Sequence, residues 1–268
     1  MITGNKHWRV LVTGGEGYIG QHLQKYIFDT HDMDVYSVDA KSGFDLLGDR
    51  SIGHIETYDC VVHLACLTGV RASNKIPHRY VEDNIKMTMS VLNQCKEYDV
   101  PCLVASSSSV KQMRSPYAYS KYAIEQICTS YPYSYNTRIF RPFTVYGHSI
   151  DRCYRSNMLY GMIQTGIIPK EIYNAQRDFT HIEDVCSAIC ILIRNARKGR
   201  AQDVYEIGYC NPITTEAFMQ GLDVDTSDIT FLDPSDETYL ESTFTCASPH
   251  RLYELGWKPK HINRIYEQ

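Results

Sequence analysis

Two side chains four residues apart have the chemistry of an assisted proton shuttle. Tyr117 and Lys121 lie in the run Tyr-Ala-Tyr-Ser-Lys, directly after Pro116, where a helix can begin. A spacing of four puts both side chains on one face of that helix, one turn apart. A phenol has a pKa of about 10, so it exchanges a proton near neutral pH only when neighbouring positive charge favours the phenolate. The pair predicts a tyrosine acid/base assisted by a lysine.

A run of four serines lies where it can serve the same reaction. Residues 106–109 follow the strand-like segment 100–105. Ligands of open parallel sheets bind at the carboxyl ends of the strands. A serine at that edge can hydrogen bond to the substrate hydroxyl that Tyr117 deprotonates. The tyrosine–lysine spacing alone arises by chance in a chain with 21 tyrosines, but together with the serines it indicates a catalytic site.

A glycine-rich loop predicts a dinucleotide cofactor. Gly14, Gly17 and Gly20 follow a branched apolar run at 8–13 and precede a helical pattern. Such glycines allow a tight turn, close approach of a pyrophosphate and close packing of helix on strand, while the amides at the helix start face the negative charge. Asp39 ends the next strand, where a carboxylate accepts hydrogen bonds from ribose hydroxyls and repels a 2′-phosphate. This arrangement favours NAD over NADP.

The elements that must position these residues alternate between strand and helix. Amphipathic helical patterns follow the glycine loop and recur at 81–95 and 117–130, and buried strands are expected at 8–13, 34–39, 60–65, 100–105 and 137–141. Strands that alternate with helices form parallel sheets with right-handed crossovers. We therefore predict an α/β fold, a Rossmann-type doubly wound parallel sheet with a small α+β lobe near the carboxyl terminus.

The pattern also predicts how the chain divides. Residues 1–147 form the expected NAD-binding domain. The helical stretch 178–197 and the strand-like 204–208 lie in a segment, 178–208, that we expect to return to it. Residues 148–177 and 209–268, in which polar loops are longer, form the expected substrate-binding lobe.

Composition narrows the class of protein. The 268 residues carry a net charge of −4, with 43% hydrophobic and 22% charged residues, which argues against disorder and against nucleic-acid binding through bulk charge. No stretch is apolar for the roughly 18 residues of a membrane span, and we expect no signal peptide. Six cysteines in apolar segments are expected to be reduced core residues: Cys60, Cys66, Cys95, Cys102, Cys186 and Cys190. A cytoplasmic protein is expected.

The motifs together resemble those of the extended short-chain dehydrogenase/reductase family, the NAD-dependent nucleotide-sugar epimerases and dehydratases. The resemblance covers nearly the whole chain and keeps the family's order; it rests on Thr13–Gly20, Val61–Ala65 with Gly69–Arg71, Leu103–Val110, Ser115–Lys121, Arg141–Gly147, Arg177–Val185 and Leu255–Pro259.

This resemblance implies a role for each matching residue. Tyr117 is the implied acid/base, Lys121 its electrostatic partner and ribose anchor, and Ser107 the catalytic serine. The implied cofactor contacts are Gly14, Gly17, Tyr18, Ile19, Gly20, Asp39, Asp45, Leu46, Leu64, Ala65, Asn84, Tyr117, Lys121 and Pro142, with Asp45 and Leu46 at the adenine. The implied substrate contacts are Ser107, Thr144, Asn157 and Arg177, the last two at the diphosphate of a sugar nucleotide.

The serine turn favours one reaction within this family. Dehydratases carry Asp-Glu directly after the catalytic residue and sugar-acid decarboxylases a glutamate, whereas this chain has Ser108 and Ser109. What remains suits 4-epimerisation: the C4 hydroxyl is oxidised, and the 4-keto sugar turns over and is reduced from its other face, with NAD retained. The resemblance implies UDP-glucose/galactose or UDP-glucuronate/galacturonate as the substrate pair.

Other activities stay open. A nucleotide-sugar 4-ketoreductase that consumes its cofactor, a dehydratase or decarboxylase of the same family, and a dinucleotide sensor without catalysis are the alternatives. The chain also departs from the family pattern, with Val110-Lys-Gln in place of Val-Tyr-Gly and only six residues between Val110 and Tyr117. The shortened loop predicts an altered substrate pocket.

Two further expectations concern histidines and assembly. His63, inside an apolar strand, is expected to be a hydrogen-bonded core residue, and His181-Ile-Glu-Asp184 a helix start, so no metal is expected. Relatives commonly dimerise through a four-helix bundle, which here would use the helices around 81–95 and 117–130. We expect a homodimer.

Overall fold

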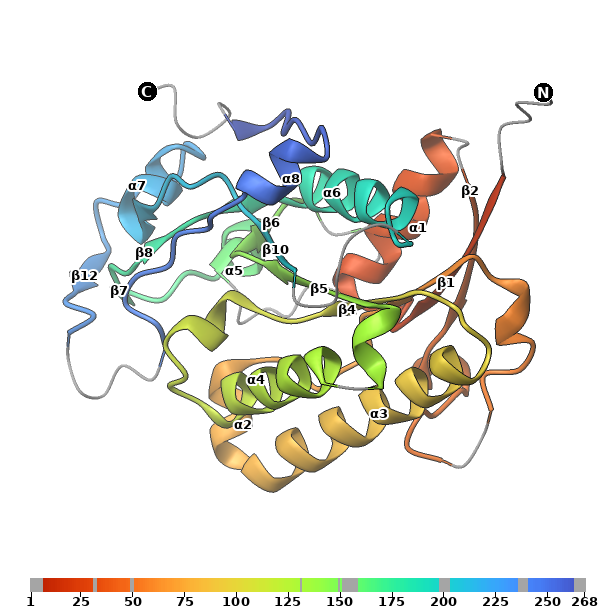
Figure 1. Ribbon diagram of the computed structural model, residues 1–268. Coiled ribbons are helices and arrows are strands. Elements are labelled where there is room, and N and C mark those ends of the chain that lie inside the picture. Colours follow the sequence, from red (N-terminus) through yellow and green to blue (C-terminus); the bar gives the residue numbers. More distant parts are fainter. Residues whose placement is uncertain are drawn as a thin grey trace.

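The protein is built on a six-stranded parallel sheet, seen in the computed structural model of Figure 1. The structure describes residues 7–30, 33–48, 51–130, 132–148, 150, 159–197, 203–235 and 241–262. The strand order is β10-β5-β4-β3-β1-β2, with β1 Trp8–Thr13, β2 Met33–Val38, β3 Cys60–His63, β4 Cys102–Ala105, β5 Thr137–Pro142 and β10 Val204–Ile207. The order reverses direction beside β1, which creates the crevice where such sheets bind ligands. The predicted doubly wound α/β fold is confirmed.

Helices cover both faces of the sheet (Figure 1). On one face lie α1 Tyr18–Thr30 and α6 Ile182–Arg194; on the other lie α2 Val70–Lys75, α3 Pro77–Glu97 and α4 Pro116–Thr129. Proline occupies the first position of both α3 and α4, where its missing N–H costs nothing. Among the residues that the structure describes, no helix is both long and apolar enough to cross a bilayer.

The core has two layers because the central strands are buried on both faces. One layer packs Val10, Val12 and Val62 against α1 and α6, and the other packs Leu11, Val61 and Val104 against α3 and α4. Strands that are buried on both faces have continuous apolar sequences. The central strands could therefore be predicted from the sequence.

One predicted helix boundary was wrong. The segment from residue 178 was expected to be helical throughout, but α6 begins only at Ile182, after the two-residue strand β9 Thr180–His181. The buried Asp178 explains the difference, because its carboxylate accepts backbone N–H groups from Tyr209, Cys210 and Ala247, each at 2.9 Å. These distant partners hold residue 178 outside any helix.

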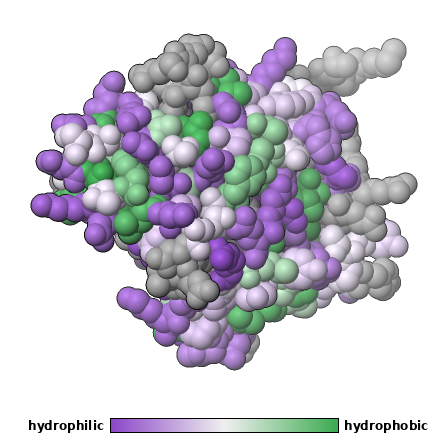
Figure 2. All heavy atoms as spheres, turned by 90° about the vertical axis from the view of Figure 1, so that its left-hand side faces the viewer, coloured by the Kyte–Doolittle hydropathy of each residue, from purple (hydrophilic) through white to green (hydrophobic). Residues whose placement is uncertain are grey.

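Most of the smaller elements gather beyond one end of the main sheet, toward the left of Figure 1. They are β6 Val145–Tyr146 paired with β9, β7 Glu171–Tyr173 with β12 Thr230–Leu232, β8 Gln176–Arg177 with β11 Ile213–Thr214, and the helices α5 Leu159–Thr165 and α7 Thr215–Gln220. The short helix α8 His250–Glu254 lies beside α6 instead, and its Leu252 belongs to the core of the main sheet. Stacked Phe179 and Phe218, 3.7 Å between ring centres, lie in their own apolar cluster. Figure 2 shows this side, with hydrophobic residues in separate patches among hydrophilic ones.

His63 is the core histidine that the sequence predicted. It is 3% exposed, and its ring nitrogens lie 2.7 Å from the Thr13 hydroxyl and 3.0 Å from the Thr88 hydroxyl. Burial, and secondarily the charge of Lys121, lowers the pKa of His63 from 6.5 to about 3. The folded protein therefore keeps this imidazole neutral where the unfolded chain would protonate it.

This shift predicts an acid-sensitive stability. Between pH 6.5 and about 3 the unfolded state binds more protons at His63, so stability falls as pH falls through this window, by up to about 1.4 kcal/mol per pH unit. We expect His63→Gln to reduce this slope and His78→Gln, an exposed histidine of α3, to leave it unchanged. Urea unfolding at several pH values measures the slope; equal slopes for wild type and His63→Gln would contradict the assignment.

Candidate active site

The glycine loop is packed so closely that side chains are excluded. Gly14 has φ +78°, and a Cβ there would lie 2.6 Å from the backbone nitrogen of Ala65. A Cβ at Gly20 would lie 2.3 Å from the Gly14 carbonyl oxygen, and Gly17 N–H donates to that same oxygen at 3.1 Å. The loop turns from β1 into α1, so the amides at the start of α1 face the space above the sheet. These residues form a cradle that fits a dinucleotide pyrophosphate.

Asp39 is held beside this loop. One carboxylate oxygen accepts the N–H of Glu16 at 3.0 Å and the other accepts that of Lys41 at 2.9 Å. An ionised carboxylate has about four acceptor positions, so capacity remains for the ribose hydroxyls. The Lys41 side chain donates to the Glu16 carbonyl at 3.0 Å. The arrangement fits the predicted preference for NAD.

The other predicted cofactor contacts lie around the same edge. Tyr18 begins α1 and donates to the Gly147 carbonyl at 3.2 Å, and Asn84, fully buried, joins Leu67 to Ser120 of α4 through its amide. Half-buried or buried residues complete this edge: Ile19 after the loop, Leu46 in the segment with exposed Asp45, Leu64 and Ala65 after β3, and Pro142 at the end of β5. The Asn84 amide thus joins the backbone of Leu67 to α4, and its hydrogen bonds are made to these two partners.

Three candidate catalytic side chains lie close together at the carboxyl edge of β4. Tyr117 lies in the first turn of α4 and is mostly buried, with Ser107 and Lys121 near enough to its phenol to act on its pKa. Lys121 lies one turn further on and is 3% exposed; its ammonium donates to the Ala105 carbonyl at 2.8 Å and lies 6.0 Å from the centre of the Tyr117 ring. The Ser107 hydroxyl accepts from the Ser109 hydroxyl at 2.8 Å.

Tyr117 is a phenol rather than a phenolate in this environment. Burial raises the pKa of Tyr117 above 10, while Lys121 and Ser107 act in the opposite direction. For Lys121, burial acts to lower the pKa, but Cys66 and Tyr117 outweigh it and the pKa is raised. Lys121 therefore stays charged, as expected, and further positive charge is needed before Tyr117 can act as a base.

Sequence reasoning missed the role of Cys66. Five of the six cysteines expected in the core are buried, but Cys66 is half-buried and lies near Lys121, whose pKa it acts to raise. Its position could have indicated this. Cys66 lies two residues after Leu64, just beyond the end of β3, and the carboxyl ends of neighbouring parallel strands lie at the same edge of the sheet. Cys66 belongs to the site rather than to the core.

A buried ionic network supports the serine turn from below. The Arg141 guanidinium binds both oxygens of Glu125, at 2.7 and 2.6 Å, and one oxygen of Glu206 at 3.1 Å. The hydroxyl of Ser106 donates to Glu125 at 2.5 Å. Glu125 and Glu206 are 3% and 8% exposed. Glu125 depends on this guanidinium for compensation, whereas Glu206 shares it with the ammonium of Lys111. Glu125, the carboxylate that these contacts bring to the serine turn, is therefore already bound by Arg141 and Ser106.

The shortened loop after the serines is fastened to the carboxyl-terminal segment. Lys111, at the end of the 3₁₀ helix Ser108–Lys111, donates to Glu206 at 2.8 Å and to the Cys246 carbonyl at 2.9 Å. Gln112 donates to the Phe244 carbonyl at 2.9 Å and accepts the N–H of Thr243 at 3.1 Å. These side chains hold the shortened loop against the carboxyl-terminal segment.

The predicted substrate residues fall into three groups. Thr144 follows β5, and its carbonyl accepts the N–H of Thr180 at 3.0 Å. Arg177, in β8, is 11% exposed and lies 3.6 Å from Glu241. Asn157 lies outside the described residues. Arg177 therefore lies in a two-stranded sheet outside the main sheet, and Thr144 lies between β5 of the main sheet and β6.

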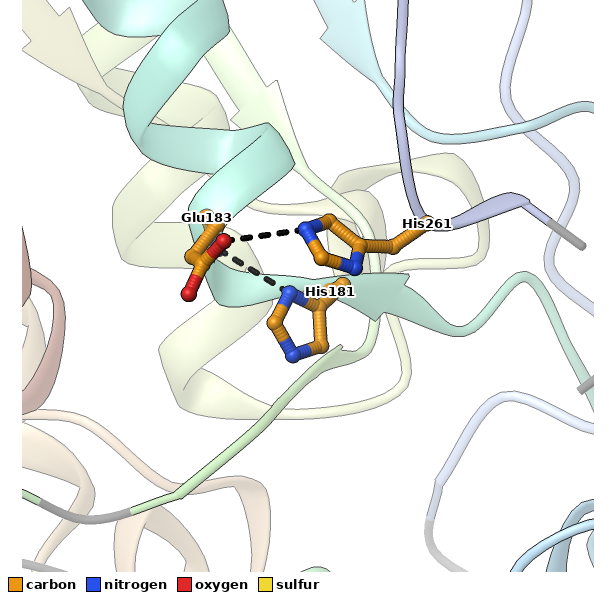
Figure 3. A group of neighbouring side chains, drawn as sticks. All are labelled: His181, Glu183 and His261. Carbon is orange, nitrogen blue, oxygen red and sulfur yellow. Dashed lines mark hydrogen bonds and ion pairs between the residues drawn. The ribbon is translucent and has the colours of Figure 1, made fainter. Parts of the chain in front are cut away.

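A separate group of potential metal ligands forms where α6 begins (Figure 3). His181 caps this helix, its Nδ1 accepting the Glu183 N–H at 3.4 Å, and His261 Nε2 lies 2.9 Å from the Glu183 carboxylate. The two imidazole rings are in contact, with centres 4.1 Å apart and planes tilted by 32°. The ring nitrogen of His181 nearest Glu183 is occupied in capping, and the contacts with His181 and Glu183 hold His261 against the start of α6.

Comparison with known proteins identifies a family. Residues 10–208 match the sequence profile of the NAD dependent epimerase/dehydratase family. This range begins in β1 and ends just after β10, so it contains the glycine loop, the serine turn and the Tyr117–Lys121 pair.

Relatives with names cover more than one reaction. The chain is 31% identical to UDP-glucuronate 4-epimerase 1 of Arabidopsis thaliana over 66% of this chain and 52% of the relative. It is 28% identical to GDP-6-deoxy-D-mannose reductase of Pseudomonas aeruginosa over 73% of this chain and 74% of the relative. The solved UDP-glucuronic acid 4-epimerase of Bacillus cereus has a TM-score of 0.78 at 24% identity, covering 94% of both chains, which shows the shared fold.

The position of Asp39 predicts its effect on cofactor choice. Asp39→Asn removes the negative charge that repels a 2′-phosphate, so we expect the ratio of NADP to NAD affinity to rise by about tenfold. Asp34→Asn, at an exposed carboxylate of β2, is the matched control and is expected to leave the ratio unchanged. Calorimetric titration with both dinucleotides measures it. An unaltered ratio in Asp39→Asn would place the ribose contact elsewhere.

The ionic network predicts a large stability effect. Arg141→Met leaves the buried Glu125 without a positive partner and Glu206 with Lys111 alone, and we expect a loss of about 3–5 kcal/mol in the free energy of unfolding. Adding Glu125→Gln to this variant removes the uncompensated charge and should restore part of the loss. Lys111→Met, at the more exposed end of the network, should cost about 1 kcal/mol. Urea unfolding checks all three; a loss under about 1 kcal/mol for Arg141→Met would refute this role.

Proposed function

Since the chain belongs to the NAD dependent epimerase/dehydratase family, we propose that it is a nucleotide-sugar 4-epimerase. The proposed substrates are UDP-sugars, the glucose/galactose or the glucuronate/galacturonate pair, in keeping with the name of the Arabidopsis relative. The proposed reaction passes through a 4-keto sugar.

The observation that carries this proposal is the chemistry of the serine turn. Ser107 lies near the Tyr117 phenol and acts to lower its pKa, and the two positions after it are Ser108 and Ser109. Elimination of water requires a general acid and a general base beyond the tyrosine. Glu125, the carboxylate that reaches this turn, is held by Arg141 and Ser106. Oxidation and reduction at one carbon need only the tyrosine, the serine and the cofactor.

The protein's own groups then have defined tasks. Ser107 orients the C4 hydroxyl, and Tyr117 takes its proton when C4 is oxidised and returns a proton when C4 is reduced. Lys121 remains charged and stabilises the phenolate. NAD, held by the glycine loop and Asp39, supplies a two-electron acceptor that also gives the electrons back, so that no net redox change occurs. Rotation of the keto sugar between the two steps inverts C4.

A 4-ketoreductase is the second candidate, because the Pseudomonas relative at 28% identity is named a reductase. It would use Tyr117 as the proton donor in a single direction. Stoichiometric loss of added NADH or NADPH during product formation would distinguish it from an epimerase.

We also propose the arrangement of lobes and subunits. Residues 148–177 and 209–268 form the substrate lobe, and residues 1–147 with 178–208 hold the cofactor. A homodimer would pair α3 and α4 of two subunits in a four-helix bundle; these helices pack together and carry exposed Tyr119 and Tyr122. Light scattering that shows only a monomer would exclude this assembly.

Tyr117 provides the test of the reaction. We expect the wild type, without added cofactor, to interconvert one gluco/galacto pair of UDP-sugars, followed by proton NMR. Tyr117→Phe removes the acid/base and should slow turnover by about 10²–10⁴-fold. Tyr119→Phe, an exposed tyrosine on the same helix, should be unaffected.

Two results would count against the proposal. Equal turnover by wild type and Tyr117→Phe would remove the catalytic assignment. Unchanged spectra for every UDP-sugar, with NAD supplied, would remove the UDP-sugar epimerase.

A further inference from the structure

A carboxylate lies between two arginines that come from different parts of the chain. Glu241 Oε1 is 3.1 Å from Arg71 Nε, and its Oε2 is 3.6 Å from Arg177 NH2. Arg71 lies in the first turn of α2, Arg177 in β8, and Glu241 in the segment that leads to α8. One carboxylate therefore receives two positive groups, each on its own oxygen.

Hydrogen bonds and a ring contact connect these three side chains to the reaction site. The backbone carbonyl of Glu241 accepts from Arg114, which lies between the serine turn and Tyr117. On the other side, Thr68, just before α2, accepts the hydroxyl of Tyr80, whose ring is perpendicular to that of Tyr117 at 6.4 Å. Arg71 and Glu241 thus lie on the two elements that flank the catalytic tyrosine.

The three side chains differ in exposure. Arg177 is 11% exposed, Glu241 33% and Arg71 63%. An ion pair as exposed as Arg71–Glu241 contributes little to stability, because water screens it. The contact to the more buried Arg177 is long. The carboxylate can therefore be displaced at low cost by an anion that binds both guanidinium groups better.

A diphosphate is such an anion. Each guanidinium presents a planar fork of donors that matches phosphate oxygens, and a diphosphate carries more negative charge and more acceptor oxygens than one carboxylate. Two guanidinium groups already directed at one small anionic group are spaced for a ligand of this kind. The internal carboxylate keeps them in that arrangement.

We propose that Arg71 is a second diphosphate-binding residue, opposite Arg177, and that Glu241 is an internal anion which the substrate diphosphate displaces. The inference rests on the proposed function, since it concerns the nucleotide-sugar site. It assigns a binding residue to α2 and makes Glu241 a determinant of affinity. Removing Glu241's charge should tighten ligand binding, whereas a carboxylate that only joined α2 to β8 would not have this effect.

The chain contains a matched control pair. Arg79 and Asp83, on α3, form an ion pair with nitrogen–oxygen distances of 3.1 and 3.0 Å. The Arg79 side chain is 54% exposed, close to the value for Arg71, and within the described part of the chain the polar contacts of these two side chains are with each other. Arg79→Gln and Asp83→Asn therefore reproduce the same chemical changes on the neighbouring helix.

The experiment is calorimetric titration of the full-length protein with UDP, and with pyrophosphate as a probe without a base. We expect Arg71→Gln to weaken UDP binding by about tenfold. We expect Glu241→Gln to tighten it by about three- to tenfold. In Arg71→Gln/Glu241→Gln the gain from the second change should shrink, because one of the released guanidinium groups is gone. Arg79→Gln and Asp83→Asn should leave the affinity unchanged.

The outcomes separate this inference from the proposed function. Unchanged or weaker UDP binding in Glu241→Gln, with an unchanged thermal midpoint, would overturn the inference even if the enzyme epimerises UDP-sugars. Arg71-dependent binding of UDP and pyrophosphate would uphold it even if no UDP-sugar were epimerised. Failure of UDP and pyrophosphate to bind the wild type would overturn it as well.

Discussion

The ion pairs of the partly buried Arg141 guanidinium are the interaction on which the architecture around the site depends. This group joins β5 to α4 through Glu125 and to β10 through Glu206. Glu125 in turn holds Ser106, the residue before the proposed catalytic serine, and Glu206 holds Lys111 in the loop after it. A buried charge is costly without a partner, so removal of Arg141 leaves Glu125 uncompensated and Glu206 with Lys111 alone.

This network explains how a short loop can replace a longer one. Between Ser107 and Tyr117 the backbone has little length to form packing of its own. Lys111 and Gln112 instead take partners in the carboxyl-terminal segment, which also pairs with β8 through Gln176. The serine turn, the segment near Glu241 and the strand of Arg177 are therefore one connected unit. A substitution in any of these three segments is therefore expected to alter the geometry of the proposed sugar pocket.

The charges of the proposed site suit ligands that carry charge themselves. Burial keeps Tyr117 protonated although Lys121 opposes this. At the other end of the site, Glu241 neutralises arginines that suit an anion. Both features suit the proposed ligands. The positive charge of a bound nicotinamide would lower the pKa of Tyr117, and the negative charge of a substrate diphosphate would replace that of Glu241.

Sequence alone determined the features that depend on local pattern. Apolar runs such as 8–13 and 60–63 marked the central strands, because strands buried on both faces have no alternation to conceal them. Gly14 and Gly20 marked a turn with no room for a Cβ, and the spacing of Tyr117 and Lys121 placed both on one helical face. Tertiary structure decided what depends on distant residues. It moved Asp178 out of the expected helix, placed Cys66 against Lys121, and joined Lys111 to Glu206, 95 residues away. Such contacts follow from how strands and helices pack, which no local spacing encodes.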